Sequence, residues 1–322
     1  MFQKQVIMRR VVYSLIPIYL FSIYLYGWRV LTVSAVVFGL GILVEYIVER
    51  KRNKKVSEAV LVTCALYSLA LPPAIPLWVA GTGIVFAVFM GKEVFGGFGR
   101  NIFNPAITGR LFVYITFPTI MDRSWMVAGR FGTLEAGVDT LTAATPLNMM
   151  RLGEMPEVLN MFFGLRNGSI GEGSILLILA AAVYLIVTKT ANWRLIISTA
   201  VSGTLLSAIL YYAGASPFPP LLGVMAGSLL FVSVFMATDP VSAPNKPVAQ
   251  WIYGSVIGTV SVLVRVFAGF PEGTSFGIMI GNTFASLIDE YSPAAKKKKK
   301  KKAPAPQAKQ QTGNPAAERG AT

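Results

Sequence analysis

The sequence predicts an all-α integral membrane protein with about ten transmembrane helices, and three observations support that prediction. Hydrophobic residues make up 54% of the 322 residues and charged residues only 14%, against about 25% charged residues in soluble domains. Mean hydropathy is +0.58. Long apolar runs recur along the chain, separated by short turns that are basic or rich in proline and glycine. The lipid bilayer is therefore the expected environment of most of the chain.

Ten apolar segments have the length or the character of membrane-spanning helices, which need about 20 residues when they are continuous. The third, fourth and fifth are short and interrupted by prolines and glycines. Such breaks are tolerated at membrane depth only where protein or a water-filled cavity covers the free backbone groups. The predicted segments are 11–28, 30–48, 58–72, 77–91, 103–118, 174–189, 194–213, 221–237, 249–268 and 273–290.

Lysine and arginine residues occur in alternate turns between these segments. With ten spans, the basic residues before span one and after every even-numbered span fall on one face, which the positive-inside rule assigns to the cytoplasm. The lysine run at 296–302 lies on the same side. We therefore predict a multi-pass protein of the inner (plasma) membrane with both termini cytoplasmic and the loop at 120–173 outside.

The chain divides into four predicted regions. A local repeat aligns Pro73 with Pro219 and Val88-Phe89-Met90 with Val234-Phe235-Met236. Two halves of five spans would be inverted in the membrane because five is odd. The two aligned spans would run in the same direction across the membrane. The alternative to an inverted repeat is therefore a local structural feature that the two spans share. The regions are a first half at 1–119, an extracytoplasmic loop at 120–173, a second half at 174–292 and a disordered basic tail at 293–322.

Several functions are excluded by residue types that the chain lacks. Cys64 is the single cysteine and there is no histidine. One thiol cannot hold an iron–sulfur cluster or close an intrachain disulfide, and histidine-ligated haem is impossible. The basic tail accompanies no folded basic domain, which argues against nucleic-acid binding.

The polar turn at 91–110 is dense in glycine and carries Asn101 and Asn104 before Pro105. Glycines such as Gly97 allow the backbone to approach a ligand closely. Asparagine amides both donate and accept, which suits the edge of a flat heterocycle. The alternative is a helix–helix turn whose asparagines cap the next helix.

A second polar turn reads "MATDPVSAPNK", and Asp239 within it could coordinate a cation, cap a helix or pair with Lys92 or Lys246. Charges near membrane spans are costly and mark functional candidates. We take Glu93, Asp239 and Asp289 as candidates for an ion path.

The predicted outer loop contains two notable pieces. "DTLTAATPL" holds Asp139, Thr142 and Thr145, and the following proline makes Thr145 extended, so its hydroxyl is presented on a thin, accessible strip. "NGSIGEGS" holds Gly168 and Ser169, whose backbone N–H groups could face an anion at a helix start. An exposed loop and a helix cap are the plain alternatives for both pieces.

Taken together, "GKEVFGGFGRNIFNPA", "TAATPL", "GSIGEGS" and "FMATDPVSAP" resemble, in order and spacing, the family of the Rnf D subunit and the homologous B subunit of the sodium-translocating NADH:quinone reductase. The resemblance covers residues 10–291 approximately. The B subunit usually has a longer N-terminal extension, and this chain enters its first predicted span near residue 11, so the Rnf D subunit is favoured.

The resemblance implies FMN in phosphoester linkage to the last threonine of a Ser/Thr-x-Ala-Thr motif, here Thr145 of 142–145, attached by a flavin transferase. It also implies a non-covalent flavin, riboflavin or FMN, near Asn101 and Asn104. The implied function is a subunit that works with other Rnf-type subunits to relay electrons between ferredoxin and NAD⁺, coupled to Na⁺ or H⁺ translocation. A secondary transporter and a non-redox structural subunit remain the alternatives.

Overall fold

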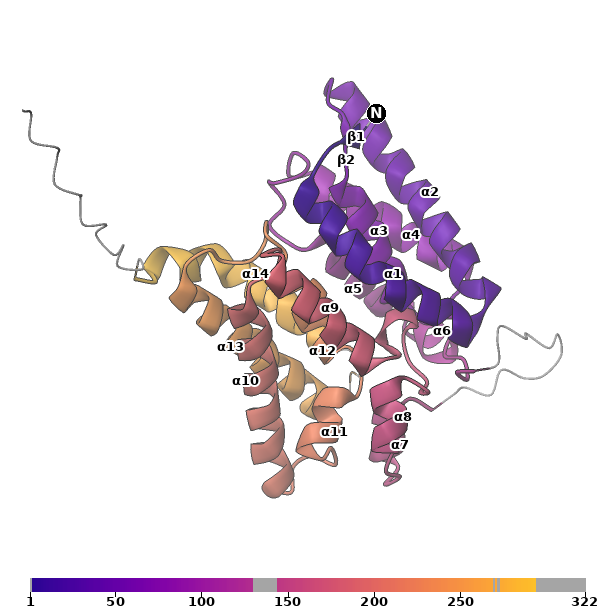
Figure 1. Cartoon of the computed structure of the whole chain (residues 1–322), viewed down its shortest axis with the longest axis vertical. Coiled ribbons are helices and arrows are strands. Elements are labelled where there is room, and N and C mark those ends of the chain that lie inside the picture. Colours follow the sequence, from indigo (N-terminus) through magenta and orange to yellow (C-terminus); the bar gives the residue numbers. More distant parts are fainter. Residues whose placement is uncertain (1, 130–143, 269, 271–272, 294–322) are drawn as a thin grey trace, which may run out of the picture.

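The computed structural model describes residues 2–129, 144–268, 270 and 273–293 as a helical bundle (Figure 1). Strands β1 (Phe2–Gln3) and β2 (Val56–Ser57) pair in parallel and hold the start of the chain. The helices of the N-terminal part are α1 (Val6–Tyr26), α2 (Trp28–Lys51), α3 (Ala59–Leu69), α4 (Leu77–Val88), the π-helical turn η1 (Phe89–Glu93), α5 (Pro105–Thr116) and α6 (Pro118–Arg123).

The remaining described helices begin just after the segment 130–143, which lies outside the described residues. Three short elements come first and longer helices follow. They are α7 (Pro146–Arg151), α8 (Val158–Phe163), the 3₁₀ turn η2 (Ile170–Glu172), α9 (Ile175–Val187), α10 (Trp193–Tyr212), α11 (Pro220–Met225), α12 (Leu229–Phe235), α13 (Pro247–Phe267) and α14 (Gly273–Tyr291).

Each of the ten predicted segments contains helix, so the all-α membrane fold is confirmed. Among the described helices, α1, α2, α10 and α13 are long and apolar enough to cross a bilayer. Helices α3 and α5 have only 11 and 12 residues, well short of about 20. Helix α3 has most of its side chains buried, so the surrounding helices separate it from lipid.

The proline and glycine interruptions expected around the third to fifth predicted spans lie between α3, α4, η1 and α5, and the structure adds an unexpected break within the eighth predicted span. Helix α11 ends at Met225 and α12 starts at Leu229, with Gly227 between them at φ +72°. Helix α4 instead runs on unbroken into η1. The two segments aligned by the local repeat therefore differ, because only the second contains a positive-φ glycine.

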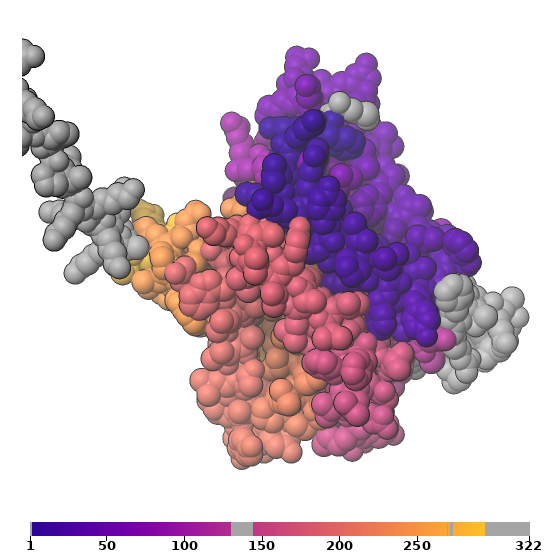
Figure 2. Space-filling view, in the orientation of Figure 1, coloured from indigo at the N-terminus to yellow at the C-terminus, as the bar shows by residue number. Residues whose placement is uncertain are grey.

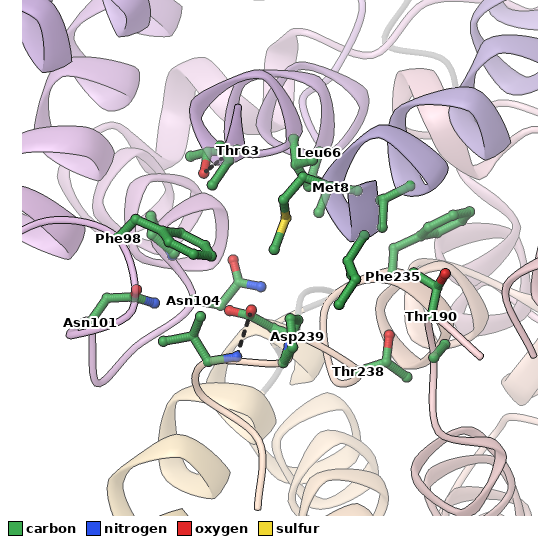
Figure 3. Close-up of a pocket in the computed structure, with 18 of the residues that line it drawn as sticks. Met8, Thr63, Leu66, Phe98, Asn101, Asn104, Thr190, Phe235, Thr238 and Asp239 are labelled. Carbon is green, nitrogen blue, oxygen red and sulfur yellow. Dashed lines mark hydrogen bonds between the residues drawn. The ribbon is translucent and has the colours of Figure 1, made fainter. Parts of the chain in front are cut away.

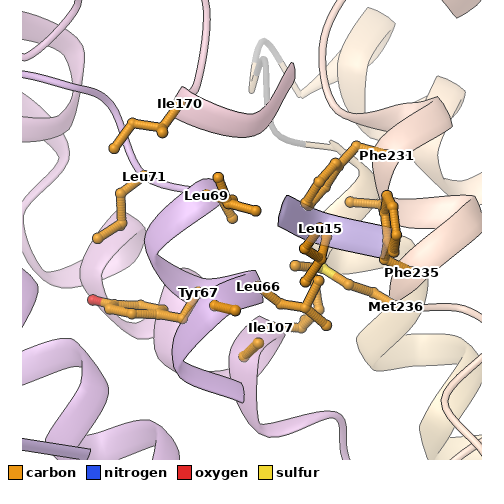
Figure 4. Close-up of a cluster of buried hydrophobic side chains, with 14 of the residues drawn as sticks. Leu15, Leu66, Tyr67, Leu69, Leu71, Ile107, Ile170, Phe231, Phe235 and Met236 are labelled. Atoms are coloured by element: carbon orange, nitrogen blue, oxygen red, sulfur yellow. The ribbon is translucent and has the colours of Figure 1, made fainter. Parts of the chain in front are cut away.

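Helices α1–α5 gather on one side of the bundle and α10–α14 on the other (Figure 1). Helix α9 packs against both α1 and α12, and Figure 2 shows α1 lying on the surface beside the later helices. One apolar core joins the two groups, with Leu15, Leu66 and Ile107 meeting Phe231 and Phe235 (Figure 4).

Helices α10 and α13 approach closely because small residues line their contact. A Cβ atom on Gly254 would lie 1.8 Å from Ser198 Oγ, and one on Gly258 would lie 2.4 Å from the Thr199 carbonyl. Small residues at this spacing are typical of helix contacts within membranes. The opposite face of α10 exposes large apolar side chains such as Val201, Leu205 and Ile209, as expected of a surface that faces lipid.

Candidate functional site

Thr145 begins helix α7. Its Oγ1 accepts a hydrogen bond from the Asn148 N–H at 3.3 Å, and Pro146 occupies the first helical position. This is the arrangement that an N-cap threonine followed by proline favours. The side chain is half-buried, so the hydroxyl is positioned by the helix start and still accessible.

Thr145 lines a cavity of about 400 Å³, which we call the threonine cavity. That volume falls within the range of about 300–1,000 Å³ typical of cofactor sites. The lining residues come from the end of α5, the α6 region, α7, the loop before α9, the α11–α12 break and the segment after α13. They are Tyr114, Pro118, Asp122, Trp125, Thr145, Pro146, Leu147, Asn148, Arg151, Arg166, Asn167, Gly168, Glu172, Gly227, Ser228, Ala268 and Phe270.

Two arginines give the threonine cavity positive charge. Arg166 is buried and donates hydrogen bonds to the carbonyls of Glu172, Gly173 and Met225, which ties the loop before α9 to the end of α11. Burial lowers the pKa of Arg166, although an arginine stays protonated in proteins. Arg151 donates to the Arg265 carbonyl at 3.1 Å. The cavity wall therefore attracts anionic groups.

Two carboxylates also line this cavity. Glu172 accepts hydrogen bonds from Arg110 at 3.3 Å and from the Ser169 hydroxyl at 2.9 Å, so it neutralises an arginine that lies 1% exposed within α5. Burial raises the pKa of Asp122. Glu172 thus has a structural role as the partner of Arg110 and Ser169, whereas Asp122 is a wall acid whose pKa burial raises.

The predicted residues of this region separate in the structure. Gly168 lines the cavity, while the Ser169 side chain is turned toward Glu172 and contributes no lining atom. The Asn167 amide donates to the Ala144 carbonyl at 3.2 Å and so holds the chain just before Thr145. Asp139 and Thr142 lie outside the described residues.

At the other end of α5, a second cavity contains the predicted asparagines (Figure 3). The Asn104 side-chain oxygen Oδ1 accepts from the Ala106 and Ile107 N–H groups at 3.0 and 3.4 Å, so Asn104 caps α5. Its amide also donates to the Met236 carbonyl at 3.4 Å. The capping alternative is therefore confirmed for Asn104, whereas the Asn101 amide donates to the Phe103 carbonyl at 3.0 Å.

This second cavity, which we call the asparagine crevice, has a volume of only about 50 Å³. Such a space holds a few water molecules and lies far below the size of a cofactor site. Figure 3 shows the side chains of Asn104 and Asp239 near each other, with Met8 extending toward them and Phe98 at one side.

Asp239 caps its own turn and does not pair with either lysine considered from the sequence. It accepts hydrogen bonds from the Val241 N–H at 3.1 Å and the Ser242 hydroxyl at 3.0 Å. Burial raises the pKa of Asp239, and these two hydrogen bonds act in the opposite direction. Lys92 pairs with Glu45 at 2.5 Å instead. Lys246 donates to the carbonyls of Glu290 and Ser292.

The three predicted ion-path residues occupy different places. Asp239 lines the asparagine crevice, while Glu93 is fully buried on η1 and forms an ion pair with Arg52 at 2.9 Å. Asp289 is half-buried near the end of α14, where it accepts from the Lys246 backbone N–H at 2.7 Å. Gly97 lines neither the threonine cavity nor the crevice: a Cβ atom there would lie 2.4 Å from Glu49 Oε1.

Sequence reasoning missed several charged residues that shape these sites. Glu172 lies in a loop whose glycines and serines drew the prediction, and Glu49 lies in a basic helix end. From the sequence alone, Arg166 is only one of several charged residues in the predicted outer loop. Its position gives no sign that it binds three carbonyls, because those carbonyls are far away along the chain or belong to a turn.

Comparison with known proteins adds the family. A model of the NQR2, RnfD, RnfE family matches residues 2–298. The chain belongs to this family. It is 38% identical over 270 residues to the B subunit of the Na⁺-translocating NADH-quinone reductase of Chromohalobacter salexigens, covering 81% of this chain and 64% of that protein. The corresponding protein of Ectopseudomonas mendocina is 38% identical over 276 residues, covering 81% of this chain and 66% of that protein.

A third relative gives the same picture. The B subunit of the same reductase from Pseudoalteromonas atlantica is 37% identical over 279 residues, covering 84% of this chain and 68% of that protein. The chain thus spans about two thirds of the length of these curated relatives, and only 64% and 66% of the first two. The similarity to each of them covers 81–84% of this chain.

Proposed function

We propose that this chain is a flavin-carrying membrane subunit of an ion-translocating oxidoreductase complex. The observation that carries the proposal is the position of Thr145, whose hydroxyl stands at the start of α7 on the wall of a cavity of about 400 Å³. Membership of the NQR2, RnfD, RnfE family and the similarity to subunits named for sodium translocation and quinone reduction support it.

The residues of the threonine cavity fit FMN held at Thr145. The Thr145 hydroxyl would receive the phosphate, and Arg151 and Arg166 would oppose the phosphate charge. Asn167, Gly168 and Tyr114 offer polar and aromatic groups to a flat ring. When bound, FMN supplies a carrier of one or two electrons. Thr142 and Asp139 belong to the same proposed site by their place in the sequence motif.

Coupling to ion movement has a simple electrostatic basis in this proposal. Added negative charge in a poorly solvated site attracts cations, and the two arginines of the cavity are already held by protein carbonyls. Glu93, Asp239 and Asp289 stay our candidates for the path of Na⁺ or H⁺. Asp122, on the same cavity wall as Thr145, would hold a proton close to the flavin.

A second, non-covalent flavin could bind at the asparagine crevice only after side chains that line the crevice move. Asn104 and Asp239 offer donors and acceptors, and Phe98 offers an aromatic face. The volume of about 50 Å³ does not fit a flavin ring. Met8 and Phe98 would have to move before riboflavin or FMN could enter.

In the proposed topology, the chain lies in the inner membrane with its termini in the cytoplasm and Thr145 outside. The separation of the two proposed flavin sites has structural support. Asn104 and Tyr114 stand at opposite ends of α5, and each lines one of the two cavities. The proposed division of the chain into regions 1–119, 120–173, 174–292 and 293–322 is based on the same topology. A flavin transferase working outside would then reach Thr145.

Two reactions are compatible with the family, and the electron donor separates them. We favour an Rnf-type relay from reduced ferredoxin to NAD⁺, on the motif resemblance. The curated relatives, named for NADH-quinone reductase, favour NADH as donor and a quinone as acceptor. In membranes containing the complete complex, NAD⁺ reduction that depends on reduced ferredoxin and on this chain supports the first reaction. Quinone reduction by NADH supports the second.

The flavin linkage is tested on the denatured full chain, purified from cells that contain the transferase. We expect in-gel flavin fluorescence and a peptide mass increased by FMN at Thr145. Thr145→Val removes both, because valine has nearly the same shape but no hydroxyl to esterify. Thr145→Ser is the matched control and retains flavin. A wild-type peptide of unmodified mass contradicts the proposal.

The alternatives give different results in the same preparation. A flavin-free chain that moves a solute by itself in liposomes would be a secondary transporter. A flavin-free chain whose deletion only prevents assembly of a membrane complex would be a structural subunit. Neither result is compatible with the flavin-carrying function.

A further inference from the structure

Two buried carboxyl groups meet at the end of the bundle opposite Thr145. Glu49 stands in the last turn of α2 and Glu93 closes η1, and their exposed fractions are 4% and 0%. Arg52 Nη1 lies 3.3 Å from Glu49 Oε1 and 2.9 Å from Glu93 Oε2. One nitrogen atom contacts both groups, so the two carboxyl groups lie next to each other on the Arg52 guanidinium.

Each carboxyl group has one oxygen left over. Glu49 Oε2 and Glu93 Oε1 are buried and have no hydrogen-bond partner among the described residues. Two ionised carboxylates are acceptors only and cannot bond to each other. A single proton between them turns one into a donor and satisfies both oxygens. Buried polar atoms are almost always hydrogen-bonded in native proteins, so the geometry calls for that proton.

The charges around the Glu49–Glu93 pair also indicate one bound proton. The other cation that acts on Glu93 is Lys92. It is 1% exposed and already bonds to Glu45 at 2.5 Å and to the Ser57 hydroxyl at 2.7 Å. Arg52 therefore supplies one positive charge for two carboxyl groups. A buried charge left without its partner is strongly destabilising, and one bound proton removes that excess charge.

We propose that Glu49 and Glu93 share one proton and form a proton-binding site at the η1 end of the bundle, with Arg52 as its gate residue toward water. The Arg52 side chain is 33% exposed, so protons can arrive from that side. Arg52 Nη2 also donates to the Glu93 carbonyl at 2.6 Å, which fixes the guanidinium across the opening.

A metal cation fits this site poorly. The described residues contain no group of three or more acidic or other ligating side chains that could hold one, and hard cations take about six or more oxygen ligands. In this pair only two carboxyl oxygens are free. Gly97 closes the remaining side, since even a Cβ atom there would lie 2.4 Å from Glu49 Oε1.

The test is infrared spectroscopy of the purified full-length chain, within its complex, in lipid at neutral pH. A protonated carboxyl group has its own carbonyl stretching band, which shifts in D₂O. We expect Glu49→Gln and Glu93→Gln each to lose the same band, equal to one carboxyl group per chain. In either variant the remaining carboxylate ionises against Arg52 and accepts a hydrogen bond from the new amide.

Arg52→Gln sharpens the test by changing the count in the opposite direction. Without the guanidinium, both carboxyl groups should be neutral, and the band should about double. Glu58→Gln is the matched control, since Glu58 is a buried acid paired with Arg9 on the neighbouring segment. Its pair has a full guanidinium for one carboxylate, so the band should stay unchanged.

Three results overturn the proposal. They are a wild-type spectrum without this band, a single Gln variant that keeps it, and a band abolished by Na⁺ but not by K⁺. The last result would mean that a cation occupies the two free oxygens. The measurement does not depend on the proposed flavin, because the band is read without electron transfer and Thr145→Val should leave it unchanged.

Discussion

The two ends of α5 face cavities of very different size. At its C-terminal end, Tyr114 lines the threonine cavity of about 400 Å³, and at its N-terminal end, Asn104 lines a crevice of about 50 Å³. Helix α12 also reaches both cavities, through its N-cap Ser228 at the first and its last residue Phe235 at the second. Twelve helical residues rise about 18 Å, so a single short helix separates a cofactor-sized space from a space for water.

The difference lies in what forms the walls. The threonine cavity is bounded by loops, short helices and the α11–α12 break, where the backbone leaves room that side chains do not fill. The crevice lies between α1, α3 and the Asn104 and Asp239 turns, and side chains such as Met8 and Leu66 occupy it. Buried charges are neutralised at both ends, by Glu172 at one and by Glu45 at the other. The difference in cavity volume therefore follows from the irregular backbone around the threonine cavity and not from a difference in the polarity of the walls.

The largest expected effect is at the threonine cavity. Glu172→Leu removes the carboxylate that pairs with Arg110, which is 1% exposed. Breaking a buried ion pair from one side costs about 3–5 kcal/mol, and unfolding followed in detergent should show that loss. Glu154→Leu is the control on the same loop region, because Glu154 is exposed. Equal losses in the two variants would remove the assigned role of the Arg110–Glu172 pair.

An intermediate effect is expected at the opposite end. Gly97 has φ +92°, and an alanine Cβ atom would meet Glu49 Oε1. Strain at such a φ costs about 1–3 kcal/mol, and displacement of Glu49 adds to it. Gly99→Ala isolates the strain, since Gly99 has φ +85° with nothing within 4 Å. The free energy of unfolding should fall more for Gly97→Ala, and an equal fall would show that Glu49 does not need this glycine.

The smallest effect separates capping from flavin binding at the crevice. Asn104→Ala removes the cap of α5 and should lower stability by about 1 kcal/mol, measured by thermal unfolding. Asn104→Ser keeps an oxygen that can cap the helix and should restore most of that loss. If non-covalent flavin is retained in the serine variant as in wild type, the Asn104 amide is only a cap. Loss of flavin with restored stability identifies the amide as a ligand.

Local pattern was sufficient for the helices and for the extended backbone at Thr145. The apolar runs gave all ten helical segments, because membrane burial is a property of composition within each run. Asn104-Pro105 and Thr145-Pro146 have the pattern of helix starts, and both residues before proline are N-caps. The break at Gly227 was missed even though the sequence has a glycine there, since glycine is also common in intact membrane helices.

Long-range partners could not be predicted in the same way. Asp239 has two lysines nearby in the predicted topology, yet Lys92 bonds to Glu45 and Ser57. Glu49 and Glu93 are far apart in sequence and belong to separate helices. Which carboxyl group meets which cation depends on how α2 and η1 are rotated, and no periodicity within one helix encodes that rotation.

By itself the sequence determined that this chain is a helical membrane protein and that Thr145 has an extended backbone before proline, because both depend on neighbouring residues. Only the tertiary structure decided that Thr145 lines a cofactor-sized cavity and that Glu49 and Glu93 lie together under one arginine. Those features arise when separate helices pack, and the free volume and unbalanced charge left between them are properties of the packing.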